Sequence, residues 1–160
     1  MISLLMPTMN RSDFVERVLS YYAGQNFRSP ILIADSSNRD EFEKTVAVVK
    51  KLDGKIDIKH LHYPGLGNYA AVYQLMDQVT TPYSTFLPDD DFFVPNSLKL
   101  LTDFLEKNPD YSCAWGKSIQ FILDSDLPYG RMSPSKLGPS NQNTCFSINQ
   151  DSAKSRLLAH

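Results

Sequence analysis

The sequence predicts an α/β fold, a mainly parallel β-sheet covered by helices on both faces. Short apolar runs typical of buried strands alternate four times with amphipathic stretches of helical spacing, and this alternation favours a parallel sheet. Polar side chains follow the apolar runs, at the strand ends where such sheets bind ligands. A chain of 160 residues is long enough for about one domain with its own core.

The first apolar run, Ile2–Met6, predicts a strand that ends at Pro7, and Asn10 can cap the helix that follows. The apolar residues of this helix recur at helical spacing. They are Phe14, Val15, Val18, Leu19 and Tyr22.

A second buried strand is predicted over residues 31–34, where the chain reads Ile-Leu-Ile-Ala. Ser37 followed by Asp40 resembles a capping box and predicts the start of a second helix. Its apolar face continues through Phe42, Val46 and Val49.

Residues Ile56–Tyr63 alternate like a third strand. Gly65 and Gly67 then predict a turn, and Asn68 can cap a third helix. The side chains expected to line that helix are Tyr69, Val72, Tyr73 and Met76.

Tyr83–Leu87 predicts a fourth strand that leads into Asp89. A fourth helix is predicted after Pro95 from the spacing of Leu98, Leu101 and Leu105, and a fifth strand over Tyr111–Ile122. Residues 124–150 lack periodicity and predict a loop. A short helix over Ser152–Leu158 ends without a stop signal, so we expect the chain to be cut there.

Composition excludes several classes of protein. The net charge is −2 and no basic run exceeds two residues, so no nucleic-acid partner is expected. No apolar stretch approaches the roughly 20 residues of a membrane span, and the N-terminus lacks the features of a signal peptide. Cys113 and Cys145 have no metal-ligand spacing, and we interpret them as free thiols of a cytoplasmic protein.

Three adjacent aspartates, Asp89, Asp90 and Asp91, lie between apolar segments. Adjacent carboxylates repel one another, so a fold keeps them together where solvent or a cation relieves the charge. Carboxylate oxygens suit Mg²⁺ or Mn²⁺, and Mg²⁺ is typically shared between one or two carboxylates and substrate phosphates. The triplet therefore predicts a metal site, with an exposed acidic turn as the alternative. Asp35, after the second strand, is either a turn residue or an acceptor of hydrogen bonds from a base or ribose.

In the same order along the chain, three segments resemble family 2 glycosyltransferases of the GT-A fold. They are residues 2–11, with a Pro-Thr-x-Asn-Arg turn, residues 31–37, and residues 86–91, with an Asp-x-Asp metal motif. The resemblance covers about residues 1–122 and implies a Rossmann-like domain that binds a nucleotide-diphospho-sugar. Residues 123–160 would then be a loop-rich segment that begins an acceptor-side region, the rest of which is missing. Asp35-Ser36 and Pro88 depart from the usual family pattern, which leaves the choice of nucleotide open.

The resemblance also implies roles for single residues. Pro7, Thr8 and Arg11 would line the nucleotide pocket, with Asp35 at the base. Asp91 would bind the Mn²⁺ or Mg²⁺ that bridges the diphosphate. The other residues expected at the nucleotide-sugar are Ser37, Asn68, Asp89 and Asp90, with Asp89 also as a metal ligand.

The implied activity is transfer of the sugar from a nucleoside-diphosphate donor to a hydroxyl of an unknown glycan, lipid or small-molecule acceptor. No general base is assigned, because the downstream aspartates Asp124, Asp126 and Asp151 match no motif. We therefore expect this chain to bind a donor but to transfer sugar poorly.

Three alternatives stay open. The chain could be a non-catalytic nucleotide-sugar-binding or interaction domain. The stretch Gly65–Ala70 matches a dinucleotide fingerprint, which would make the protein an oxidoreductase, although that fingerprint normally opens the first βα unit. His60 and His62 could be half of a metal site or simply half-buried strand residues.

Overall fold

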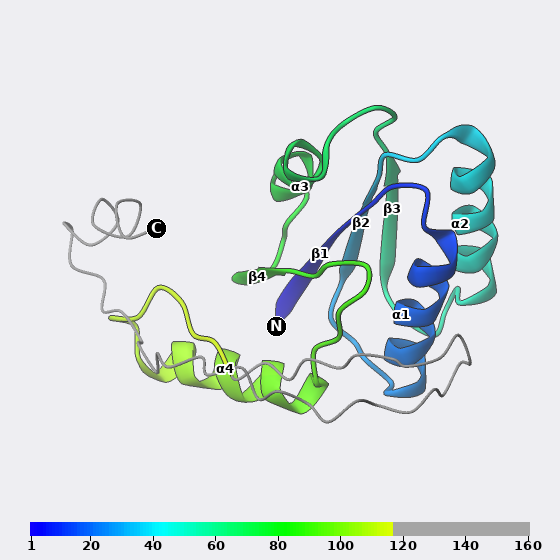
Figure 1. The fold of residues 1–160 in the computed structure, drawn as a ribbon. Coiled ribbons are helices and arrows are strands. Elements are labelled where there is room, and N and C mark those ends of the chain that lie inside the picture. Colours follow the sequence, from blue (N-terminus) through cyan, green and yellow to red (C-terminus); the bar gives the residue numbers. More distant parts are fainter. Residues whose placement is uncertain (117–160) are drawn as a thin grey trace, which may run out of the picture. The chain divides into compact units, whose positions relative to one another are not determined.

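The computed structural model describes residues 1–116, which contain four strands and four helices (Figure 1). The strands are β1 (Ile2–Thr8), β2 (Ile31–Asp35), β3 (Ile58–His62) and β4 (Tyr83–Phe86). The helices are α1 (Ser12–Gly24), α2 (Arg39–Lys51), α3 (Asn68–Met76) and α4 (Pro95–Lys107). The chain divides into two compact units, residues 1–102 and 103–160, and the sheet belongs to the first.

All four strands form one parallel sheet in the order β3-β2-β1-β4. The chain steps outward from β1 through β2 to β3, and then crosses to the other side of β1 to form β4. The order therefore reverses between β1 and β4, and in open α/β sheets ligands bind outside the carboxyl ends of the strands at such a point. The predicted parallel sheet is confirmed.

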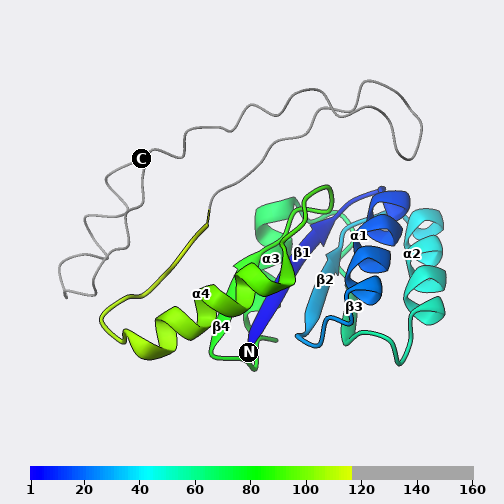
Figure 2. The same ribbon diagram turned by 90° about the horizontal axis from the view of Figure 1, so that it is seen from below.

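Helices cover both faces of the sheet, because successive strand residues point to opposite faces (Figures 1 and 2). On one face, Leu4 and Ile33 of the two central strands share a core cluster with side chains of α1, α2 and α4. On the other face, Leu5 and Leu32 share a second cluster with residues of α3. The two-sided burial explains why β1 and β2 are mostly apolar and buried, whereas the outer strand β3 has no fully buried residue.

The expected apolar face of α3 is wrong except at Val72, which is partly buried and packs on the core beneath the helix. Tyr69 and Tyr73 are 90% and 68% exposed, and Met76 is also exposed, whereas Ala71 and Leu75 are buried against the sheet. Both sets have helical spacing, so periodicity alone does not distinguish them. The small side chain of Ala71 lets the helix approach the sheet closely, and the larger aromatic residues stay on the outer side.

The three residues expected to cap helices, Asn10, Ser37 and Asn68, are not their caps. Asn38, rather than Ser37, caps α2, with its side chain accepting a hydrogen bond of 3.0 Å from the Glu41 N–H. Asn10 does not cap α1, because the residue that precedes this helix is Arg11, which makes no side-chain capping bond. Asn10 instead has a positive φ of 55° and belongs to the turn after β1. The third helix begins at Asn68 itself, after Gly67.

Several expectations fall partly or wholly outside the described residues. Of the fifth strand, residues 112–116 are not in a strand and residues 117–122 are not described. The loop 124–150, the helix Ser152–Leu158 and Cys145 also lie outside, so the domain boundary at 122 stays a prediction. Cys113 is a free thiol. Within residues 1–116, no helix has the length and apolar character needed to cross a membrane.

Candidate functional site

The candidate site opens where β1 and β4 diverge, and Pro7 explains the divergence. The backbone of Leu5 faces β4 and accepts a 2.9 Å bond from the Leu87 N–H, whereas the backbone of Thr8 faces β2 and accepts from the Ser36 N–H. By alternation Pro7 faces β4, where it has no N–H to donate. The pairing of β1 with β4 therefore stops at Leu5, three residues before its pairing with β2 ends at Thr8. At this strand-order reversal, Asp89, which follows β4, lies next to the residues at the end of β1 and just after it.

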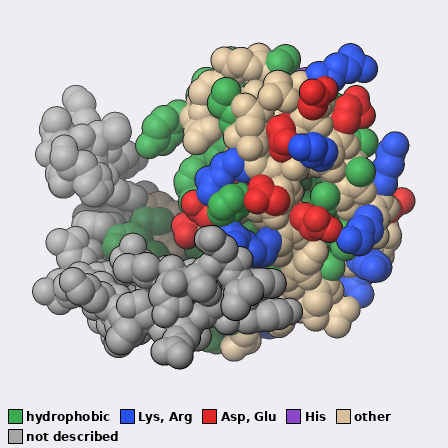
Figure 3. Space-filling view, turned by 45° about the vertical axis from the view of Figure 1, so that its right-hand side comes forward, with side chains coloured by type: hydrophobic (Ala, Val, Ile, Leu, Met, Phe, Trp, Pro, Cys, Tyr) green, Lys and Arg blue, Asp and Glu red, His purple; other side chains and the backbone are tan. Residues whose placement is uncertain are grey.

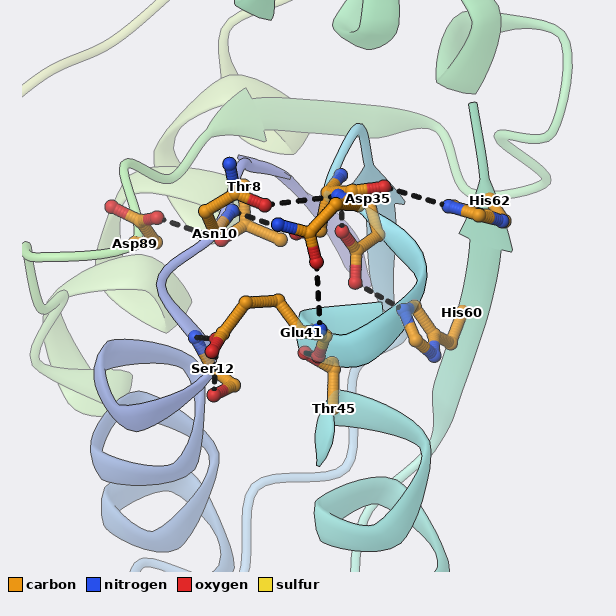
Figure 4. A network of polar contacts seen from close by, with 11 residues as sticks. Thr8, Asn10, Ser12, Asp35, Glu41, Thr45, His60, His62 and Asp89 are labelled. Atoms are coloured by element: carbon orange, nitrogen blue, oxygen red, sulfur yellow. Dashed lines mark hydrogen bonds and ion pairs between the residues drawn. The ribbon is translucent and has the colours of Figure 1, made fainter. Parts of the chain in front are cut away.

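Asp89 is bonded to Thr8 at the end of β1 (Figure 4) and to Arg11, which precedes α1. The Thr8 hydroxyl donates to Asp89 Oδ2 at 2.8 Å, and Arg11 Nη1 donates to Asp89 Oδ1 at 2.7 Å. Arg11 also reaches Asp90, with Nη2 3.1 Å from Oδ2. The first and third of the segments singled out in the sequence are thus in direct contact, and both oxygens of Asp89 have partners.

Burial and neighbouring charges shift the pKa values of two aspartates in this acidic turn. It raises the pKa of Asp89 above its usual range, although the hydrogen bond from Thr8 and the charge of Arg11 act in the opposite direction. Burial, and then the neighbouring charge of Asp90, raise the pKa of Asp91. Both shifts show carboxylates that a nearby positive charge would stabilise.

The donor set suits a cation that is shared with a ligand. Among residues 1–116, no three His, Cys, Asp or Glu side chains are arranged to hold a metal ion by themselves. Asp91 is exposed, and its backbone N–H closes the turn on the Pro88 carbonyl, whereas Asp89 is already bonded. One or two carboxylates completed by phosphate oxygens are typical of Mg²⁺ sites. The residues therefore fit a divalent cation only together with a phosphate-bearing ligand.

Asp35 is completely buried, with 0% of its surface exposed. Its Oδ1 accepts a 2.9 Å hydrogen bond from the Ser37 N–H, and its Oδ2 lies 2.9 Å from His60 Nε2 (Figure 4). Burial alone would raise the pKa of Asp35, but the bonds from His60 and Ser37 outweigh it and lower the pKa. In the free protein both carboxylate oxygens of Asp35 are thus bonded within the fold. Contact of Asp35 with a nucleobase stays a prediction.

The contact between His60 and Asp35 was not predicted from the sequence. His60 follows Asp35 by 25 residues, and only the register that pairs Asp35 with His62 and Ile33 with His60 brings the two side chains together. His62 Nε2 lies 2.9 Å from the Ser37 carbonyl. Each of the two histidines thus has a partner in the second segment, as expected of strand residues rather than of half a metal site.

The turns after β1 and β2 are joined by side chain to backbone bonds. Ser37 Oγ accepts from the Asn10 N–H at 2.7 Å, and Asn10 Oδ1 accepts from the Asn38 N–H at 2.9 Å. The hydroxyl of Ser12 donates to Glu41 at 2.7 Å and so ties the starts of α1 and α2 together. These bonds connect the second segment to the first. The sequence carried no signal for Glu41, which lies on a polar helix surface.

The stretch Gly65–Ala70 follows β3, an outer strand of the sheet, and not the strand at the order reversal. Gly65 does have the positive φ of 79° that favours glycine. A dinucleotide fingerprint, however, needs the central first strand for its pyrophosphate turn, so this position argues against an oxidoreductase. Asn68 is exposed, and among residues 1–116 its side chain is not bonded to the other candidate residues. Asp124, Asp126 and Asp151 lie outside the described residues.

Charged side chains of both signs are interspersed on the face shown in Figure 3. On this face neither sign forms a continuous patch, in line with the net charge of −2. A nucleic-acid-binding surface would instead gather basic side chains.

Comparisons with known proteins agree with this geometry. The model of the family "Glycosyl transferase family 2" matches residues 3–152. The chain is 24% identical over 119 residues to the GalNAc(5)-diNAcBac-PP-undecaprenol beta-1,3-glucosyltransferase of Campylobacter jejuni. That match covers 74% of this chain and 38% of the relative.

A solved structure shares the fold. The crystal structure of S. aureus TarS matches with a TM-score of 0.55 at 18% identity, covering 83% of this chain and 23% of that chain. The chain thus spans well under half of the length of each of these two proteins. Because the family model covers nearly all of the sequence, the chain belongs to glycosyltransferase family 2.

Proposed function

We propose that this chain binds a nucleoside-diphosphate sugar together with Mn²⁺ or Mg²⁺ and serves in transfer of the sugar to an acceptor hydroxyl. The observation that carries the proposal is the contact across the strand-order reversal, where Asp89 after β4 is bonded to Thr8 and Arg11 after β1. Ligands of open α/β sheets bind at this place. Family membership supplies the reaction class.

The residues divide by the chemistry they offer. Arg11 presents a planar guanidinium fork of the kind that binds phosphate oxygens in pairs. Asp91 offers an exposed carboxylate to a divalent cation, which when bound would neutralise charge on the departing diphosphate. Pro7 lies just beyond the last residue of β1 that pairs with β4, and a hydrogen bond joins the turns at Asn10 and Ser37. Asp35, Asn68 and Asp90 are proposed to lie along the nucleotide-sugar.

The acceptor is proposed to be a glycan, a lipid or a small molecule. The name of the Campylobacter relative describes a glucosyltransferase with an undecaprenol-linked substrate, so lipid-linked saccharides belong in an acceptor panel. A non-catalytic nucleotide-sugar-binding domain would bind the donor equally well. Only a measurement of sugar transfer distinguishes it from an active glycosyltransferase. The cytoplasmic location stays a prediction.

The direct test is isothermal titration of the 160-residue chain with nucleoside diphosphates and their sugars, with and without Mn²⁺. We expect at least one diphosphate to bind in a Mn²⁺-dependent manner, and its monophosphate to bind more weakly because it lacks the second phosphate. A chain that binds none of the nucleotides in either condition would refute the proposed function. Release of nucleoside diphosphate with an acceptor panel then tests transfer.

A further inference from the structure

Arg11 is held on two sides in the free protein. Its guanidinium donates to Asp89 at 2.7 Å and to Asp90 at 3.1 Å, and its Cζ lies 3.9 Å from the centroid of the Phe14 ring. The ring supports the guanidinium by a cation–π contact on its face. The Arg11 side chain is still 38% exposed, so it has room to move toward a ligand.

The contacts of Arg11 use the oxygens that a cation would need. Asp89 Oδ2 is taken by the Thr8 hydroxyl and Oδ1 by Arg11, and Asp90 Oδ2 is taken by Arg11 as well. Asp90 and Asp91 are both exposed, and among the described residues Asp91 has no side-chain bond of this kind. A divalent cation that binds Asp89 together with Asp91 therefore competes with Arg11 and Thr8 for the oxygens of Asp89.

A displaced guanidinium needs another anion close by. Three carboxylates and Arg11 leave a formal charge of −2, and a divalent cation brings the site to zero. A diphosphate then adds new negative charge, and its oxygens suit the guanidinium fork. The same side chain can thus neutralise the carboxylates before the ligand arrives and the phosphates afterwards.

We propose that Arg11 substitutes for the divalent cation in the donor-free protein and passes to the donor's diphosphate oxygens when the cation takes the carboxylates. This inference rests on the proposed function and adds an exchange at the same site. Because binding couplings are reciprocal, the cation binds weakly without nucleotide and the nucleotide binds weakly without the cation. Arg11 thus lowers the affinity of the site for the metal ion in the absence of nucleotide.

The test measures Mn²⁺ binding to the full chain without nucleotide, from the electron paramagnetic resonance signal of free Mn²⁺. The proteins compared are the parent, Arg11→Gln, Arg11→Lys and the control Arg17→Gln. Arg17 lies over the same Phe14 ring, 4.6 Å from its centroid, but its charge is not paired with the aspartates in the structure. Circular dichroism confirms that each variant is folded. Titrations with UDP and with GDP, each in the presence of Mn²⁺, follow.

Arg11→Gln should bind Mn²⁺ alone about tenfold more tightly, the factor that corresponds to removing a single positive charge about 6 Å from a divalent ion in water-like surroundings. The same variant should bind the nucleotide with Mn²⁺ about 10- to 100-fold more weakly, because bonds to charged groups are lost. Arg11→Lys keeps the charge without the fork, so its Mn²⁺ affinity should lie between those of the parent and Arg11→Gln. Arg17→Gln should match the parent in both measurements.

Effects in opposite directions are the signature of the exchange, since a merely structural role would weaken both ligands together. If Arg11→Gln, or Arg11→Lys should the first variant not fold, binds Mn²⁺ no more tightly than the parent, the exchange is overturned. If the parent binds no nucleoside diphosphate under any condition while Mn²⁺ binding rises in the variant, the transfer to the diphosphate is overturned together with the proposed function. These two results are distinct.

Discussion

Replacing Asp35 with alanine should destabilise the fold, because the structure shows a buried carboxylate with both oxygens in use. The change leaves the Ser37 N–H and His60 Nε2 buried without their acceptor. Each orphaned group costs about 1–3 kcal/mol, so for the two groups we expect a loss of about 2–6 kcal/mol in the free energy of unfolding. Typical single substitutions cost about 1 kcal/mol, so the effect is large enough to be diagnostic.

Asp35→Asn is the matched control, since it keeps the shape and still offers an oxygen to the Ser37 N–H. Its amide can donate to His60 in the neutral tautomer, so its loss at pH 7 should be smaller than that of alanine. Urea unfolding followed by circular dichroism measures both variants. An Asp35→Ala protein within about 0.5 kcal/mol of the parent would refute the reasoning, because ordinary surface substitutions fall in that range.

The comparison also predicts a pH dependence. The pKa of Asp35 is lower in the folded protein than its ordinary value of 3.8, so its stabilising contribution is complete above that value and is lost as the pH falls through the lowered pKa. The stability of the parent minus that of Asp35→Asn should therefore shrink below about pH 4. Asp89 and Asp91 have raised pKa values and contribute with the opposite sign, but both proteins contain them, so they cancel in the difference. A difference that does not change down to about pH 3 would assign the stabilisation to shape and not to charge.

Three further predictions concern the metal, a cap and a helix face. Asp91→Ala should remove the Mn²⁺-dependent part of stabilisation by a nucleoside diphosphate while the unligated melting temperature stays near that of the parent; an unchanged metal-dependent shift places the cation elsewhere. Asn38→Ala removes the acceptor of the Glu41 N–H and should cost about 1 kcal/mol in urea unfolding, and no loss would mean that water replaces the cap. Leu75→Ala should cost about 2–5 kcal/mol by creating a cavity, whereas Tyr73→Ser, on the exposed side of α3, should cost under about 0.5 kcal/mol; the reverse order would restore the face expected from the sequence.

Much of the fold follows from local pattern. The apolar run at residues 31–34 is buried on both faces, and the third strand lies within the expected range Ile56–Tyr63 at the outer position of the sheet. The strands β1 and β4 and the helix after Pro95 lie close to their expected bounds. Such features depend on neighbours one to four residues away, which the sequence displays directly. For this reason the parallel α/β sheet was predictable.

The predictions from the sequence were wrong where two sets of residues fitted the same local pattern equally well. On α3, the series Tyr69, Tyr73 and Met76 has the same period as Ala71 and Leu75, and only packing against the sheet selects the second set. At the start of α2, a Ser and an Asn one residue apart are both good caps, and the backbone entry angle decides in favour of Asn38. The choice in each case depends on atoms outside the local segment.

By itself the sequence determined the type and order of the elements, and it placed the polar groups after the strands, because both follow from local periodicity and from the rule that parallel strands end at one edge. Only the tertiary structure decided what those groups do there. Strand register pairs Asp35 with His60, and the sheet order places Arg11 and Thr8 on Asp89. These partners are separated by 25 to 81 residues along the chain. Contacts at such separations depend on how whole strands align in the sheet, which no local spacing in the sequence encodes.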